Sequence, residues 1–173
     1  MRTARAGTEV RLARGYSAGP PRSHMPRLET IFIAAALITR ADGRALLVRK
    51  RGTSAFMQAG GKLEPAEAAA DALCRELSEE LGLLVDPSVP VHLGRFSAPA
   101  ANEPGCTAVA EVFHLQIETP IQAAAEIEEI TWVDPQEAMV LPLAPLTRDH
   151  LLPLWISRSP AASTPPRRPW RDR

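Results

Sequence analysis

The segment spanning residues 60–83, GGKLEPAEAAADALCRELSEELGL, constrains the fold more than any other part of the chain. Its apolar residues recur with helical period and predict a helix over about residues 66–81. Gly82 is placed to supply the left-handed cap that ends such a helix. Leu73 and Leu77 fall on one face of this helix, so that face is expected to pack against a core.

Three glutamates of this segment, Glu76, Glu79 and Glu80, form one acidic stripe beside the apolar face. Like charges three or four residues apart cost an isolated helix about 0.2–0.5 kcal/mol per pair, so a neutralising cation would stabilise the stripe. Carboxylate oxygens are ligands that Mg²⁺ takes in proteins. A solvated acidic face explains the same residues, however, and the glutamate spacing alone leaves both interpretations open.

The complete spacing of the segment is more specific than the glutamates alone. Gly61 is followed after five residues by Glu67, and after seven more by RELSEELGL at positions 75–83. This pattern resembles the signature of the Nudix (MutT-type) hydrolases at every defined position, and we call residues 61–83 the Nudix box. The resemblance extends over about residues 28–156. It implies an α/β fold, namely an α/β/α sandwich with a mixed β-sheet and the box as a loop-helix-loop.

The resemblance assigns a role to each residue of the box. It implies that Mg²⁺, or Mn²⁺, is held by three carboxylates and one backbone carbonyl, those of Glu76, Glu79, Glu80 and Gly60. Arg75 would orient the neighbouring glutamates through charge-assisted hydrogen bonds. Glu67 would anchor the loop to the helix, although its place near the helix start also suits the helix dipole. Gly61 would give the loop a permissive backbone, and Gly82 would end the helix.

The catalytic group implied by the resemblance comprises Glu76, Glu79 and Arg75 together with a general base. That base is either a glutamate of the box or a glutamate from a later loop. Glu126, the first residue of EIEEITWV, is the first candidate outside the box, and Glu128 is the second. Exposed charges at the start of a strand are an equally good interpretation of both residues.

The predicted substrate contacts are Lys62 for phosphate and Phe56, Gln58 and Phe113 for the base. Lys62 could equally be a surface lysine, and each phenylalanine also suits a core position. Further candidates of the same kind are Phe32, Asn102 and Thr147.

The implied activity is Mg²⁺-dependent hydrolysis of a nucleoside diphosphate linked to another moiety. Divalent cations neutralise the phosphate oxygens and lower the pKa of a bound water, which makes that water nucleophilic. The early box and the lack of an added domain favour nucleoside triphosphates, including damaged ones, as substrates. An ADP-ribose or dinucleotide pyrophosphatase is the alternative within the family, although Pro99, sixteen residues past Leu83, meets no subfamily marker cleanly. The alternative outside enzymology is a nucleotide-sensing module without turnover.

The remaining periodicities predict strands and helices on both sides of the box. Residues 29–40 and 45–51 flank the turn sequence ADGR and predict a hairpin, and the stretch from 52 to 65 is predicted to be a loop. The other expected elements are strands at 91–98, 107–117 and 126–133 and helices at 135–139 and 148–156. Pro153 is expected to bend the last helix or end it early.

The two ends of the chain differ in composition from the rest. Residues 1–27 carry six arginines against one glutamate, and residues 157–173 carry five arginines against one aspartate. Because the net charge of the chain is zero, the domain between them is acidic, which argues against a nucleic-acid polymer as partner. We predict that both ends are disordered extensions. For residues 1–27 the alternatives are a transit peptide, a nucleic-acid-binding arm, or a segment upstream of a true start at Met25.

The longest apolar run, residues 31–38, is shorter than the roughly 20 residues of a membrane helix, so no membrane association is expected. The chain has two cysteines and no CxxC pair, which favours a reducing, cytoplasmic location. The expected partner is a small nucleotide substrate, and the sequence is compatible with a homodimer.

Overall fold

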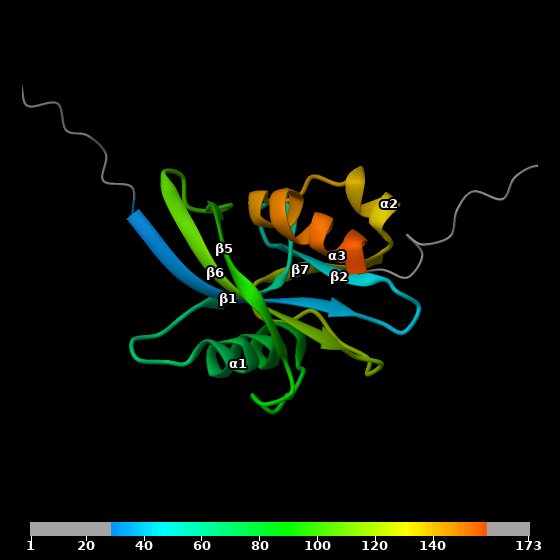
Figure 1. Ribbon diagram of the computed structural model, residues 1–173, viewed down its shortest axis with the longest axis horizontal. Helices are drawn as coiled ribbons and strands as arrows, with labels where there is room; N and C mark the ends of the chain where they lie inside the picture. The colour runs from blue at the N-terminus through cyan, green and yellow to red at the C-terminus, as the bar shows by residue number, and fades with distance from the viewer. Residues whose placement is uncertain (1–28, 159–173) are drawn as a thin grey trace, which may run out of the picture.

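The structure is a computed structural model that describes residues 29–158 (Figure 1). The predicted N-terminal extension lies outside these residues. So does the predicted C-terminal extension, except for its first two residues, which are helical. Within the described residues, no helix is long and apolar enough to cross a lipid bilayer.

The domain has three layers, with one mixed sheet between helices (Figure 1). The strands are β1 Glu29–Thr39, β2 Ala45–Lys50, β3 Phe56–Met57, β4 Ala59–Lys62, β5 Val91–Pro99, β6 Cys106–Gln116 and β7 Ile127–Val133. The helices are α1 Ala69–Leu81, α2 Pro135–Met139, the π-helical turn η1 Thr147–Leu151 and α3 Leu152–Arg158. Helix α1 covers one face of the sheet, whereas α2 and α3 cover the other. The predicted α/β/α sandwich is confirmed.

The strand order β3-β2-β1-β6-β5 places β1 at the centre of the sheet, where it runs parallel to β6. The predicted hairpin of β1 and β2 forms, but the two strands pair only beside their turn, at Thr39 and Ala45. Beyond that point β4 pairs with β1, while β3 and β7 pair with β2. The strands β1 and β2 therefore separate beyond their turn. The short strands β3 and β4, which lead into the box, pair with them in the part where they have separated.

The prediction of a loop over residues 52–65 is wrong, because β3 and β4 lie within it. These strands are two and four residues long, too short for a periodic signal, and β4 reads AGGK. Their pairing matters for the site, because β4 aligns Gly60 with Ala35 and Gly61 with Ala34 of the central strand.

Helix α1 begins three residues later than predicted, at Ala69. Ala66 has a left-handed backbone with φ of 65°, and Ala68, the N-cap, makes no capping hydrogen bond through its side chain. The end is as predicted: Gly82 has φ of 63°. The N–H groups of Gly82 and Leu83 donate to the carbonyls of Ser78 and Leu77, each at 3.1 Å, which satisfies the last turn.

The last predicted helix departs from its expected geometry. It starts with the π-helical turn η1 and continues without interruption into α3, so Pro153 neither ends nor shortens it. Pro153 is the second residue of α3. It lies two residues past the π-helical turn, where the regular i→i−4 hydrogen bonds that a proline breaks are already replaced by wider ones.

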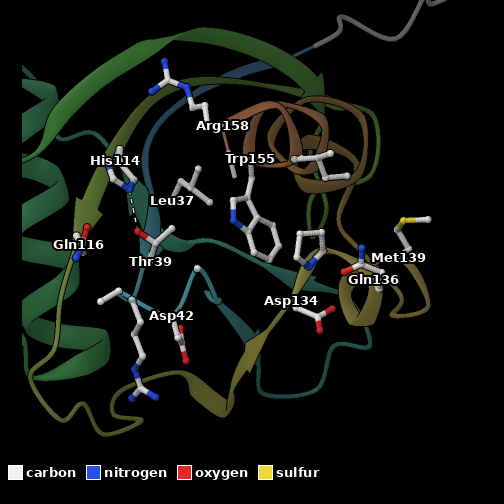
Figure 2. A pocket seen from close by; sticks show the side chains of 15 residues that line it. Leu37, Thr39, Asp42, His114, Gln116, Asp134, Gln136, Met139, Trp155 and Arg158 are labelled. Carbon is white, nitrogen blue, oxygen red and sulfur yellow. Dashed lines mark hydrogen bonds between the residues drawn. The ribbon is translucent and has the colours of Figure 1, made fainter. Parts of the chain in front are cut away.

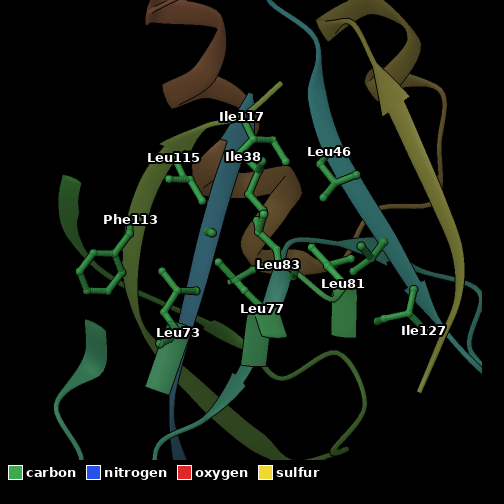
Figure 3. Packing of buried hydrophobic residues seen from close by; sticks show 14 of the residues in the cluster. Ile38, Leu46, Leu73, Leu77, Leu81, Leu83, Phe113, Leu115, Ile117 and Ile127 are labelled. Carbon is green, nitrogen blue, oxygen red and sulfur yellow. The ribbon is translucent and has the colours of Figure 1, made fainter. Parts of the chain in front are cut away.

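The main core fills the space between α1 and the sheet (Figure 3). Leu73, Leu77 and Leu81 of α1 are fully buried there and pack in one cluster with Ile38 of β1. Its neighbour Leu37 points to the other face of the sheet, where it packs in a second cluster with residues of α3. This alternation is the expected consequence of the strand's two-residue period.

Replacing Leu77 by Ala tests this packing. Leu77 is completely buried, so Leu77→Ala should lower the free energy of unfolding by about 2–5 kcal/mol. Leu84→Ala is the matched control, because Leu84 is 86% exposed and its loss should change stability by no more than about 0.5 kcal/mol. Urea unfolding of the three proteins measures both values, and equal midpoints would contradict the packing described.

Candidate active site

Arg75 connects the loop of the box to its helix. Its guanidinium binds both carboxylate oxygens of Glu67 at 3.0 Å each, and it also donates to the Lys62 carbonyl at 3.1 Å. A third nitrogen donates to Glu76 at 2.7 Å. Such paired, charge-assisted bonds have fixed geometry as well as strength. The structure thus places Arg75 beside Glu76, in the position that the resemblance implies for it.

Glu67 lies outside helix α1, two residues before its first residue. The interpretation of Glu67 as a first-turn acid is therefore wrong, because the helix starts later than predicted. Instead, Glu67 accepts from Arg75 and from the backbone N–H of Glu64 at 2.9 Å. These bonds hold the pKa of Glu67 below its usual range, and the bonds to Glu67 and then Glu76 raise the pKa of Arg75. Glu67 is positioned as an anchor of the loop.

Two consecutive glycines, Gly60 and Gly61, are required for different reasons. Gly60 has φ of 139°, and a Cβ there would lie 2.1 Å from the backbone oxygen of Ala34. At Gly61 a Cβ would lie 2.2 Å from Cδ of Glu76, so the carboxylate of Glu76 occupies the space beside this glycine. Gly61 is therefore required because the Glu76 carboxylate approaches its Cα closely, whereas the sequence analysis predicted that Gly61 gives the loop a permissive backbone.

Glu80 is the most deeply buried acid of the site, with a side chain 2% exposed. One oxygen, Oε2, accepts from the backbone N–H of Gly60 at 3.0 Å. The other, Oε1, is buried and makes no hydrogen bond among the residues that the structure describes. Nζ of Lys50 lies 3.1 Å from Oε1 as an ion pair without hydrogen-bond geometry. Burial raises the pKa of Glu80 although Lys50 opposes the shift.

Lys50, at the end of β2, was not predicted from the sequence. It pairs with Glu80 and also with Glu126, and these contacts raise its pKa although burial, the largest single influence, lowers it. The sequence VRKR in a strand reads as a solvated basic edge. Lys50 reaches Glu80, thirty positions later in the chain, because β1 and β2 separate and β4 pairs with β1.

The predicted metal ligands are not gathered around one point. Glu76 is half-buried, Glu80 is buried and Glu79 is exposed. No group of three or more His, Cys, Asp or Glu side chains is arranged to hold a metal ion within residues 29–158. The residues nevertheless fit a hard divalent cation, because Glu76 and Glu80 offer carboxylate oxygens and Oε1 of Glu80 is a buried acceptor without a hydrogen bond.

A cavity of about 420 Å³ lies beside the box. Its charged lining residues are Lys50, Lys62, Glu76, Glu103 and Glu126, and the two glycines Gly60 and Gly61 also line it. Apolar side chains, among them Ile31, Ile33 and Leu146, complete the lining. The residues predicted as site residues that line it are Gln58, Gly60, Gly61, Lys62, Glu76, Asn102, Glu126 and Thr147.

The two candidate bases lie in different places. Glu126 lines the cavity and pairs with Lys50. Glu128 instead binds Arg49 at 2.7 Å, in an exposed cluster that also includes Glu129. Lys62 also lines the cavity and is paired with Glu103 at 2.8 Å, and this bond raises the pKa of Lys62.

The structure does not bring the predicted aromatic contacts to the cavity. Phe56 and Phe113 are both 7% exposed and belong to hydrophobic clusters, and Phe113 packs edge-on against His92. Phe32 is exposed but does not line the cavity either. Their burial was not readable from the sequence, because single aromatic residues in strands suit either face. In contrast, Gln58 and Thr147 both line the cavity.

A second cavity, of about 1030 Å³, lies on the α3 side of the sheet (Figure 2). Thr39 and His114 meet there at 2.9 Å, and burial and then Arg158 lower the pKa of His114. None of the predicted site residues lines this cavity. Glu76 of the box, Glu126 and the two lysines, Lys50 and Lys62, line the smaller cavity, which is therefore the candidate active site despite its size.

Comparison with known proteins identifies the family of the chain. A model of the NUDIX domain matches residues 31–155. The CTP pyrophosphohydrolase of Escherichia coli (strain K12) is 33% identical over 123 residues, covering 68% of this chain and 86% of that protein. The solution structure of the E. coli ORF135 protein is 30% identical with a TM-score of 0.61, covering 85% of this chain and 100% of that one. The MutT protein of Methanosarcina mazei Go1, 22% identical, has a TM-score of 0.64 over 76% of this chain and 96% of its own, and shows the fold.

The three-layer fold, the acidic box and these matches define a hydrolase of phosphorus-containing anhydrides. The chain belongs to the Nudix family of pyrophosphohydrolases, whose members act on small nucleotides.

The pair of Glu67 and Arg75 predicts how stability depends on pH. The pKa of Glu67 is lower in the folded chain than its ordinary value of 4.5. The pair therefore contributes stability above about pH 4.5, and this contribution is lost as the pH falls through the folded pKa. Glu67→Gln should lower the free energy of unfolding near neutral pH. It should also make this free energy depend less steeply on pH in acid.

Urea unfolding from about pH 6 down to pH 3 measures this slope. Glu64→Gln is the control, because its side chain is exposed and makes no hydrogen bond to Arg75. The control should keep the wild-type slope. An acid slope of Glu67→Gln equal to that of the wild type would show that the pair does not couple folding to pH.

Proposed function

We propose that this chain is a Mg²⁺-dependent pyrophosphohydrolase of nucleoside triphosphates that releases a nucleoside monophosphate and pyrophosphate. Mn²⁺ is a second suitable cation, since both take oxygen ligands. The observation that carries the proposal is Oε1 of Glu80, a buried carboxylate oxygen that makes no hydrogen bond and has the ammonium of Lys50 3.1 Å away. Burying a carboxylate is costly unless positive charge lies beside it, and a divalent cation would add to the charge that Lys50 supplies.

The residues proposed to hold the cation are Glu76, Glu79, Glu80 and the carbonyl of Gly60. Glu76 lines the cavity and is held by Arg75, whereas Glu79 is exposed on the same stripe of the helix. A bound divalent cation supplies neutralisation of phosphate oxygens and a lower pKa for its bound water. Arg75 keeps the carboxylate of Glu76 directed toward the cavity instead of leaving it free to rotate.

The reaction needs positive charge on the phosphates and an acceptor for one proton. Lys62 and Lys50 supply ammonium groups in the lining of the cavity. The oxygen of a water attacks a phosphorus, the bridging P–O bond breaks, and its electron pair leaves with pyrophosphate. Glu126 also lines the cavity and is proposed to accept the proton of the attacking water, with Glu79 as the alternative within the box.

The comparisons support a nucleoside triphosphate as substrate. The relative of 33% identity is named a CTP pyrophosphohydrolase, and its match covers most of both chains. The lining of the cavity also combines the charged and apolar side chains that phosphates and a base require. We further propose that the protein acts in the cytoplasm.

The direct test is pyrophosphate release from a panel of the common nucleoside triphosphates, an oxidised triphosphate, ADP-ribose, NADH and a dinucleoside polyphosphate. Each is measured with Mg²⁺, with Mn²⁺ and with excess chelator. Metal-dependent release from triphosphates is expected. Turnover of ADP-ribose or dinucleotides alone would contradict the substrate class, and binding without any turnover would indicate a sensing module.

Glu79→Gln and Glu80→Gln should each lower kcat/KM by about 10²-fold or more, because each loses a charged oxygen while keeping its shape. Glu64→Gln, a matched change on an exposed glutamate outside the cavity, should keep the wild-type rate. Mn²⁺ binding followed by electron paramagnetic resonance should weaken in the first two proteins and not in the third. Unchanged rates for Glu79→Gln and Glu80→Gln would show that these ligands are assigned wrongly.

A further inference from the structure

The ammonium of Lys50 lies beside the one oxygen of Glu80 that is open to a cation. Its Nζ is 3.1 Å from Oε1 of Glu80, and the side chain of Lys50 is 17% exposed. The other oxygen, Oε2, already accepts from the backbone N–H of Gly60 at 3.0 Å. A cation that binds the Glu80 carboxylate therefore has to approach Oε1, where Lys50 already lies.

Lys50 neutralises the charge of Glu80. Burial and the nearby carboxylate of Glu76 both disfavour a negative charge on Glu80, whereas Lys50 and the N–H of Gly60 favour it. Among residues 29–158, Lys50 is the one cationic side chain that pairs with Glu80. Removing one partner of a buried ion pair leaves the other charge uncompensated, which is strongly destabilising. Lys50 thus does for Glu80 what a bound metal ion would also do.

Lys50 and a divalent cation would repel each other at Oε1. Mg²⁺ binds oxygens at about 2.1 Å, so a cation on Oε1 would lie within about 5 Å of an ammonium that is 3.1 Å from the same oxygen. Like charges this close repel strongly where side chains exclude water. Lys50 therefore opposes the binding of a cation for as long as its ammonium remains beside Oε1.

The ammonium of Lys50 has a second partner to which it can move. It also pairs with Glu126, whose side chain is 57% exposed, and both residues line the cavity beside the box. If Lys50 leaves Oε1, its ammonium stays paired with Glu126 and stays in the same cavity. Its charge is then not left alone in a buried place.

We propose that Lys50 competes with the divalent cation for Oε1 of Glu80: its ammonium neutralises this carboxylate in the metal-free chain and withdraws to Glu126 when the cation binds. The inference rests on the proposed function, because it concerns the cation of the same site. It gives Lys50 the role of setting how tightly the site binds metal. The exchange keeps the buried carboxylate neutralised whether or not metal is bound.

Mn²⁺ binding to the full chain, followed by electron paramagnetic resonance at about pH 8, tests the competition. Lys50→Met removes the charge and keeps the length of the side chain. It should bind Mn²⁺ about tenfold more tightly than the wild type, because no ammonium has to leave Oε1. Arg51→Met is the matched control, since Arg51 is the next residue, is exposed and is not a lining residue of the cavity. Its Kd should stay within about twofold of the wild-type value.

Thermal melting gives a second readout that does not depend on activity. Without metal, Lys50→Met should melt at a lower temperature than the wild type, because Glu80 loses the charge beside it. Saturating Mg²⁺ should raise the melting temperature of Lys50→Met by more than it raises that of the wild type, because a ligand stabilises more when it binds more tightly.

Lys50→Gln is the second variant, so the test does not depend on the folding of Lys50→Met. It removes the charge and keeps a hydrogen-bond donor for Glu126, and it should also bind Mn²⁺ more tightly than the wild type. Mn²⁺ affinity that is equal or weaker in the folded variants than in the wild type would overturn the inference.

The readout separates this inference from the proposed function. Tighter Mn²⁺ binding by Lys50→Met, together with a wild type that turns over no phosphate substrate, would contradict the proposed hydrolysis and support the competition. Metal-dependent turnover by the wild type, with no gain of Mn²⁺ affinity in either variant of Lys50, would do the reverse.

Discussion

The site depends on one set of charge-assisted hydrogen bonds, those made by Arg75. Its guanidinium joins Glu67 and the Lys62 carbonyl on the loop to Glu76 on helix α1. Without these bonds the loop from 63 to 68 would contact the helix through few groups, because the helix start has no side-chain cap. The bonds fix the distance between Gly61 and Glu76, which leaves no room for a Cβ. The sheet, the loop and the acidic stripe are thereby held in one arrangement.

Much of the fold was predictable because its signals are local. The helical period and Gly82 located the end of α1, and the flanking alternation located the hairpin of β1 and β2. The strands β3 and β4 were missed because their pairing is decided by β1 and β2, which open apart after one pair of residues. The start of α1 was missed because a run of alanines carries no capping signal and Ala66 adopts a left-handed backbone.

The site was predictable to the extent that it lies within one helix and loop. The spacing of the box identified Arg75 and its glutamates, but burial separates those glutamates: Glu80 is enclosed while Glu79 faces solvent. Lys50 could not be predicted, since its contact with Glu80 joins two elements that the separation of β1 and β2 brings together. Phe56 and Phe113 are buried in hydrophobic clusters, which single aromatic residues in strands do not reveal, whereas Gln58 and Thr147 line the cavity.

The central claim is that the cavity beside the box binds a nucleotide together with a divalent cation. A crystal structure with Mn²⁺ and the α,β-methylene analogue of CTP tests this most directly, because anomalous scattering locates the ion independently of the ligand. The account predicts an ion bound by Glu76 and Glu80 and the phosphates of the nucleotide beside Lys62 in this cavity. An ion elsewhere, or the nucleotide in the larger cavity beside α3, would contradict it.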